Sequence, residues 1–308
     1  MKLVTFEKAG HQAIGILDGD EIAVLDGAAN PDFASMLALI EAGDEGLDAA
    51  RKAQGSAARE AVAGVRLKAP VPVPVHMRDC LVFEMHRRQA RSNRHLWDPS
   101  AKPMKPEDVE IPQVWYDQPI YYKGNRFSVS GPEDTIIWPR GETRLDYELE
   151  LGMFVGKGGC DISLADAPGH IFGFTCFNDF SARDHQMLES AGGLGPAKGK
   201  DFRTANAMGP CLVTADELGD GSGLTMIARV NGEEWSRGTS SDMQHSFARI
   251  VEHASRDETL QAGEFIGSGT VGGGCGLELG RFLNPGDVVE LEIEGIGILR
   301  NRIADARR

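Results

Sequence analysis

Two glutamates separated by one residue, together with a later aspartate, are the residues of this sequence best suited to hold a metal ion. The segment 145–151 reads Leu-Asp-Tyr-Glu-Leu-Glu-Leu, with Glu148 and Glu150 at alternate positions. In a strand, alternate side chains point to the same face, about 7 Å apart along the chain. Asp179 could supply a third carboxylate. Because neighbouring carboxylates repel each other unless a positive charge lies between them, we predict that the three bind a divalent cation.

The alternative for this pair is an exposed strand edge whose acids are solvated by water. The surrounding residues favour the metal site instead, because Leu149, Leu151 and the run 153–155 are apolar. Asp179 also follows a mainly apolar run, Phe-Thr-Cys-Phe at 174–177. A central strand that carries unpaired buried acids is very unfavourable. The apolar context therefore predicts that these acids have a positively charged partner.

Four other polar residues are candidates for chemistry, although none identifies a function alone. Asp79 could cap a helix over 83–93, and His86 could be a surface residue of that helix. Lys200 could be a solvated loop lysine, and Glu278 an exposed acid. Residue type leaves these alternatives open. It also leaves open whether the segment 83–95 is an ordered helix or a lid that closes on substrate.

Charge and composition exclude several classes of partner. The 308-residue chain has a formal charge of −14 and a pI of about 5.0, which argues against binding to nucleic acids or anionic membranes. No apolar run reaches the ~18 residues of a membrane span, and residues 1–7 lack the apolar core of a signal peptide. The five cysteines are scattered without a Cys-x-x-Cys pair, which is typical of reduced thiols. We therefore expect a cytoplasmic protein.

The beginning of the chain predicts a small α+β domain. Residues 1–26 alternate between turn signals as in an antiparallel β unit, and 32–54 carry an apolar stripe at helical spacing. A second short helix is expected near 57–64. Prolines at alternate positions in 68–75 forbid a helix and favour an extended linker. The predicted domains are 1–70 and 71–308.

The second domain is predicted to be mostly β. Long alternation of helices with strands is missing, so a parallel doubly wound sheet is not expected. The glycine-rich segment 267–274 lacks the lysine of a P-loop, which argues against a phosphate site. A helix is expected after Ser241 and Asp242, which could cap its start. Strands are expected near 135–139, 145–155, 171–180, 209–214, 223–231 and 286–300. The predicted fold class is α+β, mostly β.

Four blocks of the sequence resemble the fumarylacetoacetate hydrolase family. They are Asp-Tyr-Glu-Leu-Glu at 146–150, Asn-Asp-Phe-Ser-Ala-Arg-Asp at 178–184, Gly-Lys-Asp-Phe at 199–202 and Gly-Ser-Gly-Thr at 267–270. They occur in the family's order and nearly at its spacing, and the resemblance covers residues 75–302. The segment 79–86 is similar to the fumarylacetoacetase branch in particular. The resemblance implies a mixed β-roll or β-sandwich for the second domain, and a homodimer.

The resemblance also implies a role for each candidate residue. The metal ligands would be Asp79, Glu148, Glu150 and Asp179, around Mg²⁺, Mn²⁺ or Ca²⁺. His86 would be the general base, held in place by Glu278. The residues that would stabilise the developing oxyanion are Lys200, Arg183 and Gln186, and Thr270 would contact the substrate.

The activity that the resemblance implies is hydrolysis of a C–C bond in a β-diketo acid, such as an acylpyruvate or fumarylacetoacetate. His86 and Glu278 favour hydrolysis, because cleavage needs a positioned base for water. The alternatives are decarboxylation of a 2-oxo acid, isomerisation of a dienoic acid, or binding of a small molecule without catalysis. The segment 121–127 departs from the substrate loop of true fumarylacetoacetases, and the N-terminal domain is shorter. The sequence therefore does not name the substrate, beyond a small keto acid.

Overall fold

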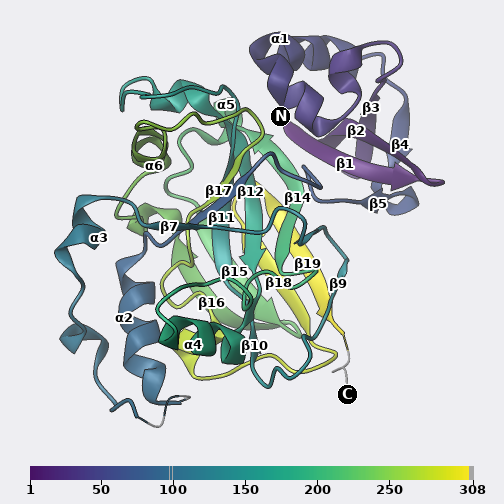
Figure 1. Cartoon of the computed structure of the whole chain (residues 1–308). Coiled ribbons are helices and arrows are strands. Elements are labelled where there is room, and N and C mark those ends of the chain that lie inside the picture. The colour runs from purple at the N-terminus through teal and green to yellow at the C-terminus, as the bar shows by residue number, and fades with distance from the viewer. Residues whose placement is uncertain (97, 99, 305–308) are drawn as a thin grey trace.

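The computed structural model describes residues 1–96, 98 and 100–304 (Figure 1). Within these residues, twelve strands form one mixed sheet. Ten of them lie side by side in the order β4-β3-β2-β1-β14-β12-β11-β17-β6-β7. These strands are β1 (Lys2–Lys8), β2 (His11–Asp18), β3 (Glu21–Leu25), β4 (Arg59–Ala61), β6 (Met77–Cys80), β7 (Tyr121–Lys123), β11 (Leu149–Val155), β12 (Ile171–Asp179), β14 (Asn206–Thr214) and β17 (Phe265–Gly267). Two further strands, β5 (Arg66–Leu67) and β8 (Val129–Ser130), pair with β1 and β14.

A second sheet covers one face of the large sheet and closes the main core. Its strands follow the order β16-β15-β18-β19-β9. They are β9 (Thr135–Ile136), β15 (Thr225–Val230), β16 (Glu233–Thr239), β18 (Val288–Ile293) and β19 (Gly297–Ile303). Buried side chains of both sheets, such as Leu151 and Leu291, belong to one hydrophobic cluster. Two short strands, β10 (Leu145–Asp146) and β13 (Ser181–Ala182), pair with each other in a separate two-stranded sheet.

Strand alternation separates apolar from acidic side chains on β11. Leu149, Leu151 and Met153 belong to the core between the two sheets, so Glu150 and Phe154 point to the opposite face. Gly152 also lies on that opposite face, where a Cβ atom would approach the ring of Phe265 to 2.3 Å. The large sheet therefore keeps one apolar face and presents its acids on the other.

The N-terminal strands form the predicted antiparallel unit, and β1 joins β14 antiparallel. The predicted helical segment 32–54 is found as a 3₁₀ turn, η1 (Pro31–Phe33), followed by α1 (Met36–Gln54), which packs on this unit. The helix is interrupted at Gly43, whose φ of +58° and ψ of −139° are not helical. The prediction of a helix near 57–64 is wrong. Residues 59–61 form the strand β4, which pairs with β3, and only the 3₁₀ turn η2 (Val62–Gly64) is helical. The domain boundary near residue 70 stays a prediction, and positions 305–308 of the second predicted domain lie outside the described residues.

The second part of the chain follows the predicted pattern with three corrections. The segment 145–155 splits into β10 and β11, and 286–300 is a hairpin of β18 and β19 that turns at Gly295, whose φ is +79°. The predicted helix begins at Phe247 rather than near 241, because the Ser246 side chain accepts a hydrogen bond from the Arg249 backbone N–H. The prediction of an α+β, mostly β fold is confirmed.

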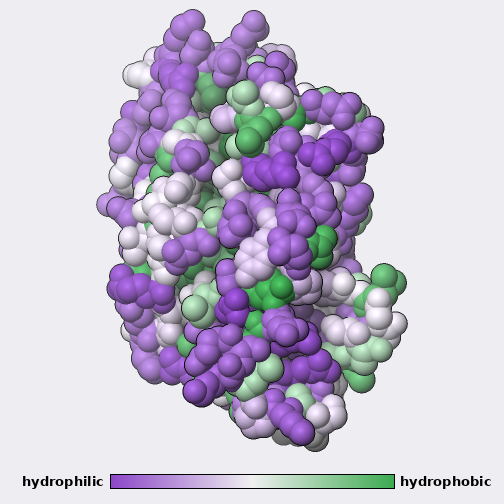
Figure 2. All heavy atoms as spheres, turned by 90° about the vertical axis from the view of Figure 1, so that its left-hand side faces the viewer, coloured by the Kyte–Doolittle hydropathy of each residue, from purple (hydrophilic) through white to green (hydrophobic). Residues whose placement is uncertain are grey.

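The remaining helices lie mainly around the edges of the sheets. They are α2 (Glu84–Ser92), α3 (Gln113–Asp117), α4 (Arg183–Ala191), α5 (Ala215–Leu218), α6 (Phe247–Ala254) and α7 (Gly276–Leu279), with 3₁₀ turns η3 (Asn93–Leu96), η4 (Pro106–Asp108), η5 (Ala167–His170) and η6 (Ser240–Asp242). Figure 2 views the side that carries α2 and α3 and shows a largely hydrophilic surface with separate hydrophobic patches. Within the described ranges, none of the helices has the length and apolar character that a membrane span requires.

Candidate active site

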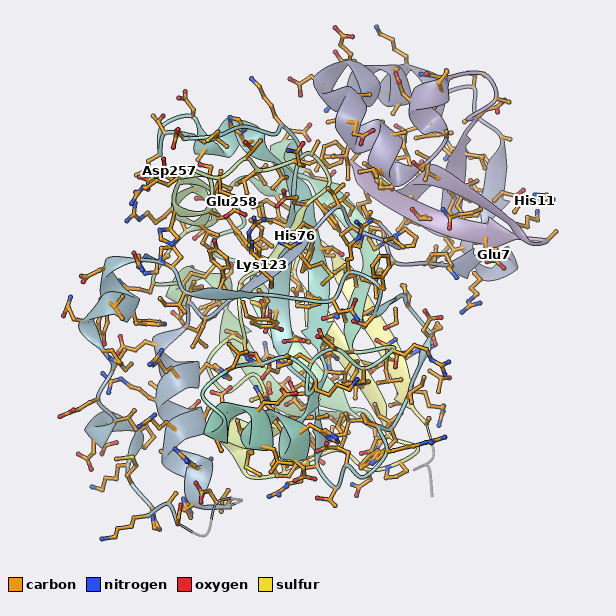
Figure 3. The ribbon with its side chains drawn as sticks, in the orientation of Figure 1. Glu7, His11, His76, Lys123, Asp257 and Glu258 are labelled. Carbon is orange, nitrogen blue, oxygen red and sulfur yellow. The ribbon has the colours of Figure 1, made fainter. Side chains whose placement is uncertain are left out.

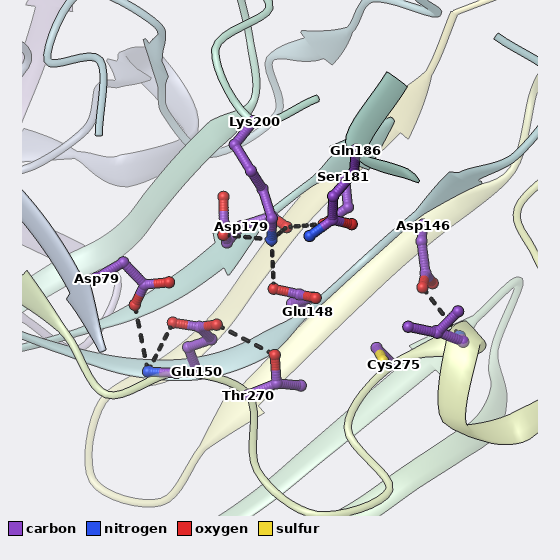
Figure 4. Close-up of polar contacts among 12 residues, drawn as sticks. Asp79, Asp146, Glu148, Glu150, Asp179, Ser181, Gln186, Lys200, Thr270 and Cys275 are labelled. Carbon is purple, nitrogen blue, oxygen red and sulfur yellow. Dashed lines mark hydrogen bonds and ion pairs between the residues drawn. The ribbon is translucent and has the colours of Figure 1, made fainter. Parts of the chain in front are cut away.

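Three buried carboxylates from different strands meet on the acidic face of the large sheet (Figure 4). Asp79 comes from β6, Glu150 from β11 and Asp179 from the end of β12. One oxygen of each lies within 4.8 Å of the other two. The structure thus brings together residues that are up to 100 positions apart in the chain, and we call these three residues the carboxylate triad.

The Gly-Ser-Gly-Thr segment after β17 allows the triad to form. Gly267 pairs with Asp79, and a Cβ atom there would lie 2.3 Å from the Asp79 Oδ1 atom. The Gly269 backbone N–H donates to Asp79 Oδ1 at 3.2 Å and to Glu150 Oε2 at 3.1 Å. The Thr270 hydroxyl donates to Glu150 Oε1 at 3.2 Å. Gly267 therefore leaves room for the two carboxylates to approach each other, while the backbone N–H of Gly269 orients both.

The charges of the triad are incompletely compensated by the protein. Burial, followed by the charge of Asp179, raises the pKa of Asp79 to about 7. Burial also raises the pKa of Asp179 to about 6, although Lys200 opposes this shift. Burial and the neighbouring acids raise the pKa of Glu150 well above its usual value. The Asp179 Oδ1 atom is buried without a hydrogen-bond partner, so the oxygen-rich triad fits a hard divalent cation.

The structure places Glu148 beside the triad but in a different electrostatic environment. Its Oε2 atom accepts a hydrogen bond from Lys200 Nζ at 2.5 Å, and its Oε1 atom accepts one from Arg183 Nη2 at 2.7 Å. Burial opposes ionisation, but these two cations outweigh it and lower the pKa of Glu148. Lys200 also donates to Asp179 Oδ2 at 2.5 Å. The predicted role of Glu148 as a ligand stays a prediction, because its carboxylate would have to exchange Lys200 for the cation.

His86 and Glu278 form the predicted pair, and Cys275, which contacts Glu278, pairs with the backbone of Glu148. His86, on α2, lies with its Nδ1 atom 2.8 Å from Glu278 Oε1, on α7. The Asn93 side chain donates to the Glu278 backbone carbonyl at 2.7 Å and so ties α2 to α7. Burial lowers the basicity of His86, but Glu278 outweighs it and raises the pKa of the imidazole. Because Nδ1 faces Glu278, the Nε2 atom is the one available for proton transfer with a substrate.

Sequence reasoning missed Asp146 as a functional residue. Its buried carboxylate accepts two hydrogen bonds from Arg183, at 2.9 and 2.7 Å. It also accepts hydrogen bonds from the backbone N–H groups of Gly276 and Leu277, which begin α7. Arg183 in turn donates to Gln186 Oε1 at 2.8 Å. Asp146 therefore holds Arg183 and, through it, Gln186, and it also anchors the helix that carries Glu278. Its place in the Asp-Tyr-Glu-Leu-Glu block was the available signal.

Tyr122 is a second residue that the sequence analysis did not assign. Its hydroxyl donates to Asp179 Oδ2 at 2.7 Å. The strand that carries it, β7, pairs with β6 so that Tyr122 lies opposite Asp79. Because the sequence gives no signal that residues 121–123 form an edge strand beside Asp79, the contact could be found only in the structure.

Ion pairs on the other side of β6 hold Asp79 in place. Arg78 is buried and pairs with Glu264 and, at 2.5 Å, with Glu258. Lys123 lies 3.4 Å from Glu258, and Figure 3 shows both near His76, far from Glu7 and His11 on the N-terminal hairpin. Since side chains alternate along a strand, anchoring Arg78 on one face turns Asp79 toward the triad.

The raised pKa values predict how pH controls metal binding. Asp79 and Asp179 hold protons in the metal-free folded state up to about pH 6–7, whereas the unfolded chain releases them near pH 4. The folded state therefore binds more protons in this window, so the triad lowers stability as pH rises through it. We expect Mg²⁺ to raise the unfolding temperature more at about pH 8 than at about pH 5.5, because binding needs ionised carboxylates. Thermal unfolding with and without Mg²⁺ checks this, and an equal rise at both pH values would contradict it.

A second prediction concerns Asp146. Asp146→Asn removes the charge that neutralises Arg183, so we expect stability to fall by about 3 kcal/mol and kcat by about 10- to 100-fold, as for residues that orient a metal site. Mg²⁺ affinity should stay close to the parent value, because Asp146 does not contact the triad. Urea unfolding, steady-state kinetics and Mg²⁺ titration measure the three effects. Asp184→Asn is the control, since Asp184 pairs with Arg144 instead; equal kinetic losses in both variants would contradict the role of Asp146.

Comparisons with known proteins agree with this geometry over most of the chain. Residues 88–304 match the family model described as fumarylacetoacetate (FAA) hydrolase C-terminal. Asp79 and His86 precede the matched segment. The chain is 30% identical to the oxaloacetate tautomerase YisK of Bacillus subtilis, over 98% of this chain and 100% of that protein.

Two further similarities involve a human protein and a solved structure. The chain is 34% identical to the human mitochondrial oxaloacetate tautomerase FAHD2A, over 65% of this chain and 62% of that protein. It also resembles the structure of fumarylacetoacetate hydrolase from Exiguobacterium antarcticum, with a TM-score of 0.78 and 28% identity over 100% of both chains.

Proposed function

Because the chain belongs to the fumarylacetoacetate hydrolase family, we propose that it is a divalent-metal-dependent enzyme that interconverts the keto and enol forms of a 2-oxo dicarboxylate such as oxaloacetate. The observation that carries the proposal is the buried His86–Glu278 pair together with a carboxylate triad whose charge is incompletely compensated. Oxaloacetate enters the proposal from the names of the tautomerases of Bacillus subtilis and human mitochondria.

The triad residues Asp79, Glu150 and Asp179 would hold the cation. A bound divalent cation supplies Lewis-acid polarisation of the substrate's carbonyl oxygens. It would also offset the mutual repulsion that raises the pKa values of the triad. The triad would bind a hard cation such as Mg²⁺ or Mn²⁺ in preference to a soft one, because all three ligands are carboxylate oxygens.

The residues of this chain can carry out the proton transfer that enolisation requires. His86, with Nδ1 held by Glu278, can take the proton from C3 of the 2-oxo acid at Nε2 and deliver it to the C2 oxygen, and the same two transfers in reverse restore the keto form. Glu278 stabilises the imidazolium that forms, because the carboxylate lies 2.8 Å from the ring nitrogen. Arg183 and Lys200 hold positive charge beside the site where negative charge develops on the substrate.

Hydrolysis of a C–C bond, which the sequence analysis put first, remains the second candidate. The His86–Glu278 pair that favoured it does not distinguish the two reactions, because the same base can accept a proton from water or from carbon. The names of the two tautomerases favour enolisation. The specific observation in favour of hydrolysis is the likeness to fumarylacetoacetate hydrolase from Exiguobacterium antarcticum over the full length of both chains.

Parallel assays of two substrates distinguish the candidates. We would follow oxaloacetate and acetylpyruvate in D₂O by NMR, with Mg²⁺ alone and the Glu150→Gln variant as background controls. The proposal predicts accelerated enol–keto conversion and deuterium exchange at C3 of oxaloacetate, with its carbon skeleton intact. Release of acetate and pyruvate from acetylpyruvate, with oxaloacetate exchange at background, would overturn it in favour of hydrolysis. Formation of pyruvate from oxaloacetate would instead favour a decarboxylase.

A further inference from the structure

Cys275 is a buried thiol at the proposed catalytic pair that the reaction leaves unused. It immediately precedes α7, and its side chain has no exposed surface. Its Sγ atom donates to Glu278 Oε1 at 3.4 Å, and the same oxygen lies 2.8 Å from His86 Nδ1. A nitrogen, a sulfur and an oxygen ligand therefore converge on one small volume.

The spacing of these three atoms suits a metal ion. One ligand atom from each residue lies within 4.8 Å of the other two. Bonds of about 2.0–2.1 Å to nitrogen and about 2.3 Å to sulfur around tetrahedral Zn²⁺ place neighbouring ligand atoms roughly 3.3–3.6 Å apart. The sulfur–oxygen distance of 3.4 Å already fits, and the nitrogen–oxygen distance of 2.8 Å would have to widen slightly. Glu278 Oε2 accepts a hydrogen bond from the Gly273 backbone N–H at 2.7 Å. Glu278 Oε1 would thus stay oriented toward the ion, as ligands held by a second hydrogen bond do.

We propose that His86, Cys275 and Glu278 form a second metal site, which binds thiophilic ions such as Zn²⁺ and thereby blocks the catalytic base. The binding itself is independent of the proposed function, whereas the inhibition rests on it. A neutral imidazole, a thiolate and a carboxylate together carry two negative charges, which a divalent ion neutralises, so the buried complex has no net charge.

Ligand chemistry separates this site from the carboxylate triad. The triad offers only oxygen atoms, which suit Mg²⁺, whereas thiolate and imidazole select softer ions. The two sites are close, because Cys275 forms a backbone bridge with Glu148. An ion at the second site would occupy His86 Nδ1, so the neutral ring would carry its single proton on Nε2, and that atom could no longer accept a proton from the substrate. The triad could keep its own cation while the base is held by the second ion.

Binding must release the proton of the thiol. Burial and the charge of Glu278 raise the pKa of Cys275 well above its usual value, so the free protein carries the thiol form. The ion replaces that proton: the S–H bond breaks, a metal–sulfur bond forms, and one proton passes to solvent. A protonated His86 would release a second proton. No oxidant or reductant is involved.

Cobalt(II) tests the site by spectroscopy without an activity assay. The protein is first saturated with Mg²⁺ to fill the triad and then titrated with Co²⁺. The proposal predicts a near-ultraviolet thiolate-to-cobalt charge-transfer band that is lost in Cys275→Ser. Cys160→Ser, at an exposed thiol, and Cys211→Ser, at a buried one, should keep the band. Absence of the band from the parent protein, or its persistence in Cys275→Ser, would overturn the proposal.

Zinc inhibition tests the consequence. In excess Mg²⁺, Zn²⁺ should inhibit the parent protein, and the Zn²⁺ concentration for half inhibition should rise about tenfold or more in Cys275→Ser, as a ligand is lost. If Cys275→Ser does not fold, anomalous scattering at the zinc edge from parent crystals decides the question. A zinc peak between His86, Cys275 and Glu278 supports the site, and zinc found only in the triad overturns it. An inactive parent protein that still shows the cobalt band would refute the proposed function and not this site.

Discussion

Glu150→Gln should severely weaken Mg²⁺ binding, abolish activity and make the metal-free protein more stable. The Glu150 carboxylate is fully buried and surrounded by acids, and its pKa is raised well above the usual value. Because this carboxyl holds a proton in the folded state that the unfolded chain releases, Glu150 lowers stability at neutral pH, and a neutral amide of the same shape removes that cost. We expect an unfolding temperature a few degrees higher without metal, no further rise on adding Mg²⁺, and Mg²⁺ affinity reduced by about 100-fold or more. Calorimetric titration and thermal unfolding measure these effects.

Glu148→Gln is the matched control, because the two glutamates are two positions apart but have opposite environments. Lys200 and Arg183 lower the pKa of Glu148, so its charge stabilises the fold. Removing it leaves two buried cations with one partner fewer each and should lower the unfolding temperature, with a cost of about 3 kcal/mol. If the two variants shift the metal-free unfolding temperature in the same direction, then the opposite electrostatic environments described for Glu148 and Glu150 are wrong.

His86→Gln should lower kcat by about 10²- to 10⁴-fold and leave Mg²⁺ affinity unchanged. This is the usual contribution of a general base, and His86 is not among the residues of the carboxylate triad. Glutamine can still donate to Glu278, so the fold around α2 and α7 should persist. Steady-state kinetics, together with Mg²⁺ titration of the same sample, measures both quantities.

The pH dependence of catalysis gives a second test of the pair. Glu278 raises the pKa of His86, so kcat/KM should increase with pH through a value above that of an ordinary histidine as the imidazole loses its proton. In Glu278→Gln, the rise of kcat/KM should occur at lower pH, and the highest kcat/KM that is reached should be smaller. His245→Gln, at a buried histidine that contacts the Trp115 carbonyl instead, is the control. A parent-like rate in His86→Gln would remove His86 from the mechanism.

The acidic face of the large sheet could be predicted from the sequence because it depends on a local pattern. Alternate glutamates within an apolar run must share a face and must find a positive partner, and both expectations follow from period-two geometry. The different electrostatic environments of Glu148 and Glu150 could not be predicted. They depend on Lys200, Arg183 and the loop at Gly269, which reach the two carboxylates from separate parts of the chain.

Residues that join the site through long-range pairing were found only by resemblance or not at all. Asp79 faces Glu150 because β6 pairs parallel with β17, and a four-residue strand gives no sequence signal for its partner. The resemblance supplied Asp79 and His86, but it did not supply Tyr122 from β7. The errors in secondary structure have a similar cause: pairing with β3 made a strand at residues 59–61, where propensity favoured a helix.

Manganese located in a crystal tests the central claim most directly. Crystals soaked in Mn²⁺ would be measured near the manganese edge, and the anomalous difference map would be calculated without assuming a site. The account predicts one strong peak between the side-chain oxygens of Asp79, Glu150 and Asp179, and no such peak in crystals of Glu150→Gln. Fully soaked parent crystals that show no peak among these three carboxylates would contradict it.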